Sequence, residues 1–252
     1  MKILFAILFL VPLAGLAQMD SVISGSYKWR QPSIQEDQVN SVVLLEGKVR
    51  DFDWMQLSAN TISAATEIKQ TVPKKQEQLI IVKSGAMNIR FGDSTWLLTA
   101  NSTAVLMPGE KFSLINPGAA AAHFITMKYS RNSTVNDAKA AGNSYVVLWE
   151  NVPFKPNNNG GGRRDLFDRS TVLQKRFEIH VTTLKEGRRS HEPHTHRAEE
   201  IVLVIEGQTE MQIDEKFYTT NTGGFYYLGS NMLHAIKTTS TTPSTYFAIQ
   251  FE

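Results

Sequence analysis

Histidine and glutamate residues gather near the end of the sequence at a spacing suited to holding a metal ion. His194 and His196 are two residues apart, Glu200 follows four residues later, and His234 lies beyond a turn at residues 229–231. On an extended strand, residues i and i+2 point the same way, so both paired imidazoles can reach one ion. Three imidazoles and one carboxylate suit Mn, Fe, Co, Ni or Zn better than Ca or Mg. The sequence therefore predicts one divalent transition-metal site.

Other residues could complete a reaction at such an ion. The metal would act as a Lewis acid on a bound substrate, and a nearby base would move the proton. Tyr246, His180 and His191 are the candidate catalytic residues, two on predicted strands and one in the loop before the paired histidines. His180 could equally face outward, in a subunit contact. Because side chains alternate along a strand, Met211, Gln250 and Tyr246 are expected to contact substrate.

Strand-forming segments dominate the rest of the chain. They are rich in Val, Ile, Thr, Phe and Tyr and are separated by Gly, Asn, Asp and Pro, which is typical of short strands joined by turns. Helical periodicity is scarce, so the sequence predicts an all-β sandwich or barrel. The clearest predicted strands are residues 41–45, 79–82, 96–99, 103–107, 123–128, 144–149, 177–184, 201–205, 209–213, 225–227 and 246–251.

An internal repeat divides the chain into two β units. Residues 77–85 (EQLIIVKSG) line up with residues 199–207 (EEIVLVIEG) at an offset of 122, and residues 107–109 line up with residues 227–229 at an offset of 120. In the first unit, the positions that match the four ligands hold Val72, Lys74, Gln78 and Leu114. Valine and leucine cannot coordinate a metal, and lysine repels one, so we predict a metal-free, structural first unit.

A linker is predicted between the two units. Three Asn and three Gly follow one another at residues 157–162, and such a run does not form a stable element. We expect Arg163 and Arg164 beside it to be a solvated pair of charges. The predicted division is a signal peptide at residues 1–17, a first unit at 18–154, a linker at 155–170 and a second unit at 171–252.

The N-terminus has the features of a secretory signal. Lys2 precedes an apolar run at residues 3–13 and a small-x-small tripeptide that ends at Ala17. The run is too short to span a bilayer comfortably, so we expect cleavage, a secreted or periplasmic protein, and no membrane contact afterwards. A formal net charge of +2 gives no electrostatic case for binding nucleic acid. The chain has no cysteine, which excludes disulfides and thiolate ligands.

The metal-ligand pattern resembles that of the cupin family. The first cupin motif is matched by Gly187, His194, His196, Glu200 and Gly207. The second motif is matched less closely, by Gly224, Leu228 in place of its proline, and His234. The resemblance implies two tandem cupin barrels, each a jelly roll or double-stranded β-helix, with one mononuclear metal in the second. It also implies a homodimer, because cupins often pair through their outer sheet faces.

The order of a metal-free cupin and a metal-binding cupin is similar to that of the ureidoglycine aminohydrolases, which are manganese enzymes. This resemblance favours Mn among the divalent metals. The Glu, His, His and Gln ligands of that family fall at His194, His196, Glu200 and His234. A tyrosine of that family is kept as Tyr246, and its lysine near the C-terminus corresponds to Gln250.

Three functional hypotheses follow. The first is an exported, metal-dependent bicupin enzyme of isomerase, lyase or aminohydrolase type, acting on a small polar metabolite such as a sugar acid or a ureido acid. The alternative is a non-catalytic module in which the metal helps to bind a small molecule or carbohydrate. The third is a storage or interaction protein. A fold of this kind hosts many activities, so the site must decide among them.

Overall fold

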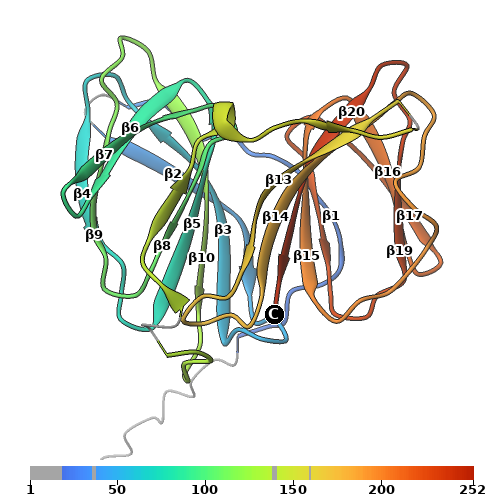
Figure 1. Cartoon of the computed structure of the whole chain (residues 1–252), viewed down its shortest axis with the longest axis horizontal. Coiled ribbons are helices and arrows are strands. Elements are labelled where there is room, and N and C mark those ends of the chain that lie inside the picture. Colours follow the sequence, from blue (N-terminus) through green and yellow to red (C-terminus); the bar gives the residue numbers. More distant parts are fainter. Residues whose placement is uncertain (1–18, 36–37, 138–140, 159) are drawn as a thin grey trace, which may run out of the picture.

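Two β-barrels lie side by side, as the sequence predicts (Figure 1). The computed structural model describes residues 19–35, 38–137, 141–158 and 160–252, so the predicted signal peptide at residues 1–17 lies outside the described residues. Strands carry almost all of the regular structure, which confirms the predicted all-β class. In the described ranges, no helix combines the length and apolar character that crossing a membrane requires.

The first barrel combines a large and a small antiparallel sheet. Within the described ranges, the strand order is β11-β8-β5-β10-β3-β2 in the large sheet and β4-β9-β6-β7 in the small one. The large sheet contains β2 (Val39–Gly47), β3 (Trp54–Ile62), β5 (Gln76–Ser84), β8 (Thr103–Leu106), β10 (Ala122–Ser130) and β11 (Tyr145–Val147). The small sheet contains β4 (Glu67–Thr71), β6 (Ala86–Phe91), β7 (Ser94–Thr99) and β9 (Lys111–Ile115).

The second barrel repeats this arrangement. For the described residues, its large sheet has the order β1-β18-β15-β20-β14-β13-β12 and its small sheet the order β17-β16-β19. The large sheet contains β1 (Gly25–Tyr27), β12 (Lys155–Pro156), β13 (Gly162–Arg169), β14 (Phe177–Leu184), β15 (Glu199–Glu206), β18 (Phe225–Leu228) and β20 (Ser244–Phe251). The small sheet contains β16 (Gln208–Ile213), β17 (Lys216–Asn221) and β19 (His234–Thr238).

Two short strands of the predicted first unit pair with different barrels. β1 lies near the start of that unit but pairs with β18 of the second barrel, where Gly25 lies opposite Tyr227. β11 lies near its end and pairs with β8 of the first barrel, where Tyr145 lies opposite Val105. The predicted boundary at residue 154 is therefore wrong for β1, which covers the exposed edge of the second barrel and satisfies its backbone groups.

The repeat runs through the central strand pairings at an offset of 122 residues. Gln78 pairs with Leu106, and Glu200 pairs with Leu228. Phe91 pairs with Phe112, and Ile213 pairs with His234. The residue equivalent to His234 is thus Phe112, and the predicted Leu114 is wrong, because the two-residue slip that we placed before it does not occur. Phe112 belongs to an apolar cluster that fills the interior of the first barrel.

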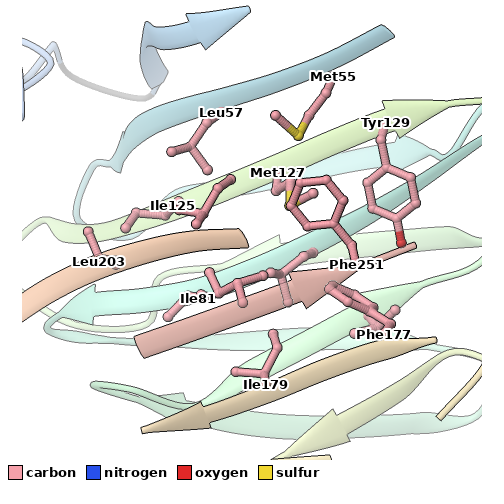
Figure 2. Close-up of a cluster of buried hydrophobic side chains, with 14 of the residues drawn as sticks. Met55, Leu57, Ile81, Ile125, Met127, Tyr129, Phe177, Ile179, Leu203 and Phe251 are labelled. Carbon is pink, nitrogen blue, oxygen red and sulfur yellow. The ribbon is translucent and has the colours of Figure 1, made fainter. Parts of the chain in front are cut away.

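A continuous apolar core joins the two barrels. Its side chains come from the faces of the large sheets that point toward each other, and Figure 2 shows ten of them labelled: Met55, Leu57, Ile81, Ile125, Met127, Tyr129, Phe177, Ile179, Leu203 and Phe251. Because the opposite face of each large sheet lines its own barrel, the central strands are buried on both faces. This explains their long apolar runs.

The segment predicted as a linker is a β-hairpin. β12 and β13 pair antiparallel, with Lys155 opposite Arg163, and β13 continues along β14. Asn157 and Gly161 belong to its turn, where Asn157 Oδ1 accepts a hydrogen bond from the Gly161 N–H at 3.1 Å. The prediction of an unstructured linker at 155–170 failed because the residues after the turn find a partner strand that lies outside the local sequence.

The inter-barrel core should dominate stability. Phe251 is fully buried and stacks on Phe52 of the first barrel, with ring centroids 5.4 Å apart. Phe251→Ala should lower the free energy of unfolding by about 3–5 kcal/mol, measured by urea denaturation. Phe217→Ala is the control, because that ring is 62% exposed and its loss should cost little. Equal losses in the two variants would contradict a shared core.

Candidate metal centre

The four predicted ligands converge on the inner side of the second barrel. Glu200 lies on β15, His234 begins β19, and His194 and His196 lie in the loop between β14 and β15. Two backbone hydrogen bonds join the loop to β19: His194 N–H donates to His234 O at 3.1 Å, and His234 N–H donates to His194 O at 3.0 Å. This pairing brings imidazoles that are 40 residues apart in the sequence to one point.

The ligand atoms are close enough to share one ion. One nitrogen from each of His194, His196 and His234 lies within 4.8 Å of the other two. Glu200 Oε2 lies 3.5 Å from His196 Nε2 and 3.5 Å from His234 Nε2. The structure therefore brings together all four residues that the sequence singles out.

Backbone carbonyls fix the orientation of two of the rings. His196 Nδ1 lies 2.8 Å from Ala198 O, and His234 Nδ1 lies 2.9 Å from Met232 O. A carbonyl only accepts, so each Nδ1 carries the proton and each Nε2 keeps a free lone pair. His196 Nε2 is buried without a hydrogen-bond partner among the described residues. A buried acceptor of this kind fits a metal ion, and the donor set is of the type that transition metals prefer.

The electrostatics of the site favour ligand-competent side chains. Burial lowers the pKa of His194 and of His234, and the neighbouring imidazoles lower that of His194 further. The neighbouring carboxylate of Glu200 raises the pKa of His196. Burial alone would raise the pKa of Glu200, but its contacts with His196 and His234 hold it below the usual value. The lowered pKa values favour neutral imidazoles at His194 and His234 and an ionised carboxylate at Glu200.

A cavity of about 300 Å³ opens from the metal ligands. All the predicted catalytic and substrate-contacting residues line it, since His180, His191, Met211, Tyr246 and Gln250 are among its walls. The alternation predicted for the strands is thus correct, and His180 faces the cavity instead of a subunit contact. Their roles in a reaction stay predictions.

Tyr246 is placed to hold a proton. Its side chain is buried, and burial raises the pKa of Tyr246 to about 12, although its hydroxyl hydrogen-bonds with Ser190 and Thr182. The phenol therefore stays protonated at neutral pH. It is suited to donating a hydrogen bond or a proton, and less suited to the role of base that the sequence allowed.

An ionic network that sequence reasoning missed supports His180. Its Nδ1 lies 3.0 Å from Glu178 Oε1, and Arg163 and Arg176 both form ion pairs with the same carboxylate. Hydrogen bonding to His180, together with the two guanidinium groups, lowers the pKa of Glu178 to about 2. Arg163 lines the cavity. Our expectation of a solvated Arg163–Arg164 pair holds only in part: Arg163 is exposed but forms ion pairs, and Arg164 stacks on Trp149.

His191 lies beside the ligands. Its ring centroid is 4.1 Å from that of His194, in an edge-to-face arrangement. Its Nδ1 lies 3.0 Å from Glu192 O, so Nε2 keeps its lone pair. The side chain is exposed and lines the cavity. His191 is therefore placed to contact an incoming molecule.

The comparisons with known proteins agree with this geometry. A family model described as a cupin domain matches residues 180–250, which include all four predicted ligands. AerE from Microcystis aeruginosa has a similar structure, with 15% identity, a TM-score of 0.67, and coverage of 90% of this chain and 98% of that chain. Protein YlbA from E. coli shares 14% identity at a TM-score of 0.62, over 88% of this chain and 94% of that chain.

An oxalate decarboxylase from Lactobacillus farciminis, solved as a formate complex, shares 8% identity at a TM-score of 0.65, over 89% of this chain and 85% of that chain. No curated protein matches the sequence. These likenesses show the fold: an all-β pair of tandem barrels, of which the second matches the cupin domain model. They do not single out the ureidoglycine aminohydrolases, so that resemblance stays a prediction.

Removing one imidazole should abolish tight metal binding. His196→Ala leaves three ligands and removes the acceptor atom Nε2. The purified variant should therefore contain far less than one metal per chain by elemental analysis. His123→Ala is the control, because His123 lies in the first barrel, where its Nδ1 contacts the side chains of Gln31 and Thr61. A variant His196→Ala that keeps its metal and its melting temperature would contradict the site.

The ionised state of Glu178 should stabilise the fold in a pH-dependent way. Its pKa is about 2 in the folded protein against 4.5 as the reference value. A lowered pKa contributes stability that is present above the unfolded pKa and is lost as pH falls toward the folded one. The difference in unfolding free energy between the wild type and Glu178→Gln should therefore shrink from pH 6 to pH 3 in urea titrations. A constant difference would contradict the network.

Proposed function

We propose that the protein is an exported, metal-dependent enzyme that acts on a small polar acid bound at the metal in the second barrel. The observation that carries the proposal is the buried His196 Nε2, which has no hydrogen-bond partner in the described part of the chain and lies among the other predicted ligands at a cavity. His194, His196, Glu200 and His234 would hold the ion, with manganese tested first. When bound, the ion would supply Lewis acidity to an oxygen of the substrate.

The cavity favours a small acidic substrate. About 300 Å³ is at the lower end of the range for ligand pockets, so a metabolite fits and a polymer does not. Arg163 places a positive charge in the wall, where it can attract a carboxylate. Gln250 and Thr182 supply hydrogen-bonding groups, and Met211 supplies apolar contact. Sugar acids and ureido acids both match this lining.

The residues opposite the ligands can handle a proton. Glu178 holds His180 through Nδ1, which leaves Nε2 of that ring for the cavity. Held in this way, His180 is the better candidate for the base. Tyr246, which keeps its proton, is the better candidate for the donor. A pure binding module has no need for this carboxylate–imidazole pair, so the pair favours an enzyme over the non-catalytic alternative.

Two measurements test the proposal. Elemental analysis of the natively purified protein should find one transition metal per chain. Thermal-shift assays with galacturonate, glucuronate and ureidoglycolate, with and without Mn²⁺, should then show that either the sugar acids or the ureido acid stabilise the protein in a metal-dependent way. An NMR assay should then detect turnover of the acid that stabilises it. His196→Ala should lose both responses.

The outcomes separate the hypotheses. A metal-free protein would overturn the metal-dependent function. Stabilisation by an acid without turnover would favour the binding module. We also propose that residues 1–17 are removed on export and that the mature chain forms a homodimer, which N-terminal sequencing and light scattering would check.

A further inference from the structure

A turn of the metal-free barrel contacts the immediate neighbours of the metal ligands. Residues 50–51 lie between β2 and β3. The N–H of Arg50 donates to Glu199 Oε1 at 3.1 Å, and the N–H of Asp51 donates to Glu199 Oε2 at 3.4 Å. Glu199 directly precedes the ligand Glu200 on β15, and the two side chains point to opposite faces of the strand. The carboxylate of Glu199 is almost fully buried, so these contacts are its main compensation together with the Tyr227 hydroxyl at 2.6 Å.

The same turn contacts two other parts of the metal site. Asp51 Oδ1 forms an ion pair with Arg197 Nη2 at 3.1 Å, and Arg197 directly follows the ligand His196. Arg131 of the first barrel holds Asp51 in place with an ion pair of 3.0 Å.

Arg50 Nη1 donates to Ser230 Oγ at 3.0 Å, and the residue after Ser230, Asn231, donates its N–H to His196 O at 2.8 Å.

The repeat offers a matched contact on the other side of the molecule. There Leu173 N–H donates to Glu77 Oε1 at 3.0 Å, and the hydroxyls of Tyr129 and Thr171 donate to Glu77 Oε2, each at 2.7 Å. Glu77 precedes Gln78, the residue equivalent to Glu200. Both buried glutamates thus join the barrels, but only Glu199 lies beside metal ligands.

We propose that the 50–51 turn is a positioning element that holds Glu200 and His196 at the geometry of the metal site. The inference rests on the proposed metal function and gives the metal-free barrel a role in it. Metal ligands must lie within about 0.2 Å of ideal distances, so a shift in the backbone beside two ligands weakens binding. Arg50, Asp51, Glu199 and Arg197 are positioning residues, because each acts through a neighbour.

The first experiment compares two glutamine variants of the full chain. In Glu199→Gln, one carboxylate oxygen becomes a donor that faces a backbone N–H, and Mn²⁺ affinity should fall by about tenfold or more. The affinity is measured by titration with Mn²⁺, following the electron paramagnetic resonance signal of the free ion. Glu77→Gln makes the same substitution at the other contact, where the Tyr129 and Thr171 hydroxyls can accept from the new amide. It should keep the wild-type affinity, although both variants lose thermal stability. The visible spectrum of the Co²⁺-loaded protein should change only in Glu199→Gln.

A milder pair of variants covers the case in which the buried variants do not fold. Arg197 is 42% exposed and Arg90 is 46% exposed, and each forms an ion pair with a carboxylate. Arg197→Gln should weaken Mn²⁺ binding by up to about fivefold, the loss expected from its exposed ion pairs. Arg90→Gln, in the small sheet of the first barrel, should leave it unchanged.

The outcomes distinguish this inference from the proposed function. If the wild type binds neither Mn²⁺ nor Co²⁺, the metal function fails and the inference fails with it. If the wild type binds metal but Glu199→Gln and Glu77→Gln change the affinity equally, or not at all, only the positioning role is overturned. Loss confined to Glu199→Gln and Arg197→Gln supports it.

Discussion

Alternation of side chains along strands that are buried on both faces is the constraint on which the rest of the structure depends. On β15, neighbouring glutamates enter two different environments: Glu199 lies in the interface between the barrels, and Glu200 lies among the imidazoles. A buried carboxylate is costly unless hydrogen bonds or charges compensate it, so each face of the strand needs its own set of partners. The inter-barrel contact and the metal ligands are therefore connected through a single peptide bond.

The same alternation explains how much of the fold and the site the sequence could predict. Phe247, Ile249 and Phe251 belong to the inter-barrel core, whereas Tyr246 and Gln250 line the cavity. Because side chains alternate with a period of two, the sequence separates these two sets of residues without knowledge of the strands that pair with β20. The ligands were also predictable, because histidine and glutamate at this spacing have few other uses and because Glu200 begins an apolar strand.

Features that depend on distant partners could not be predicted. Nothing in residues 25–27 shows that they pair with β18. Arg163 follows a run of Asn and Gly, and only its pairing beside Thr182 brings it to the cavity. The error at Leu114 came from matching a turn by residue type, whereas the strand register keeps the offset of 122 between Phe112 and His234. A usable signal was overlooked at Glu77 and Glu199, where the repeat keeps an acid in an apolar strand.

The pairing of β1 with the second barrel has a consequence for synthesis on the ribosome. β1 emerges among the first described residues, but its partner β18 is made some 200 residues later. Until then its backbone groups stay unpaired, while the first barrel can close as soon as β11 is translated. A gene cut between the two halves would separate β1 from the barrel that it completes. The second half would then expose an open edge of β18, a surface that promotes aggregation.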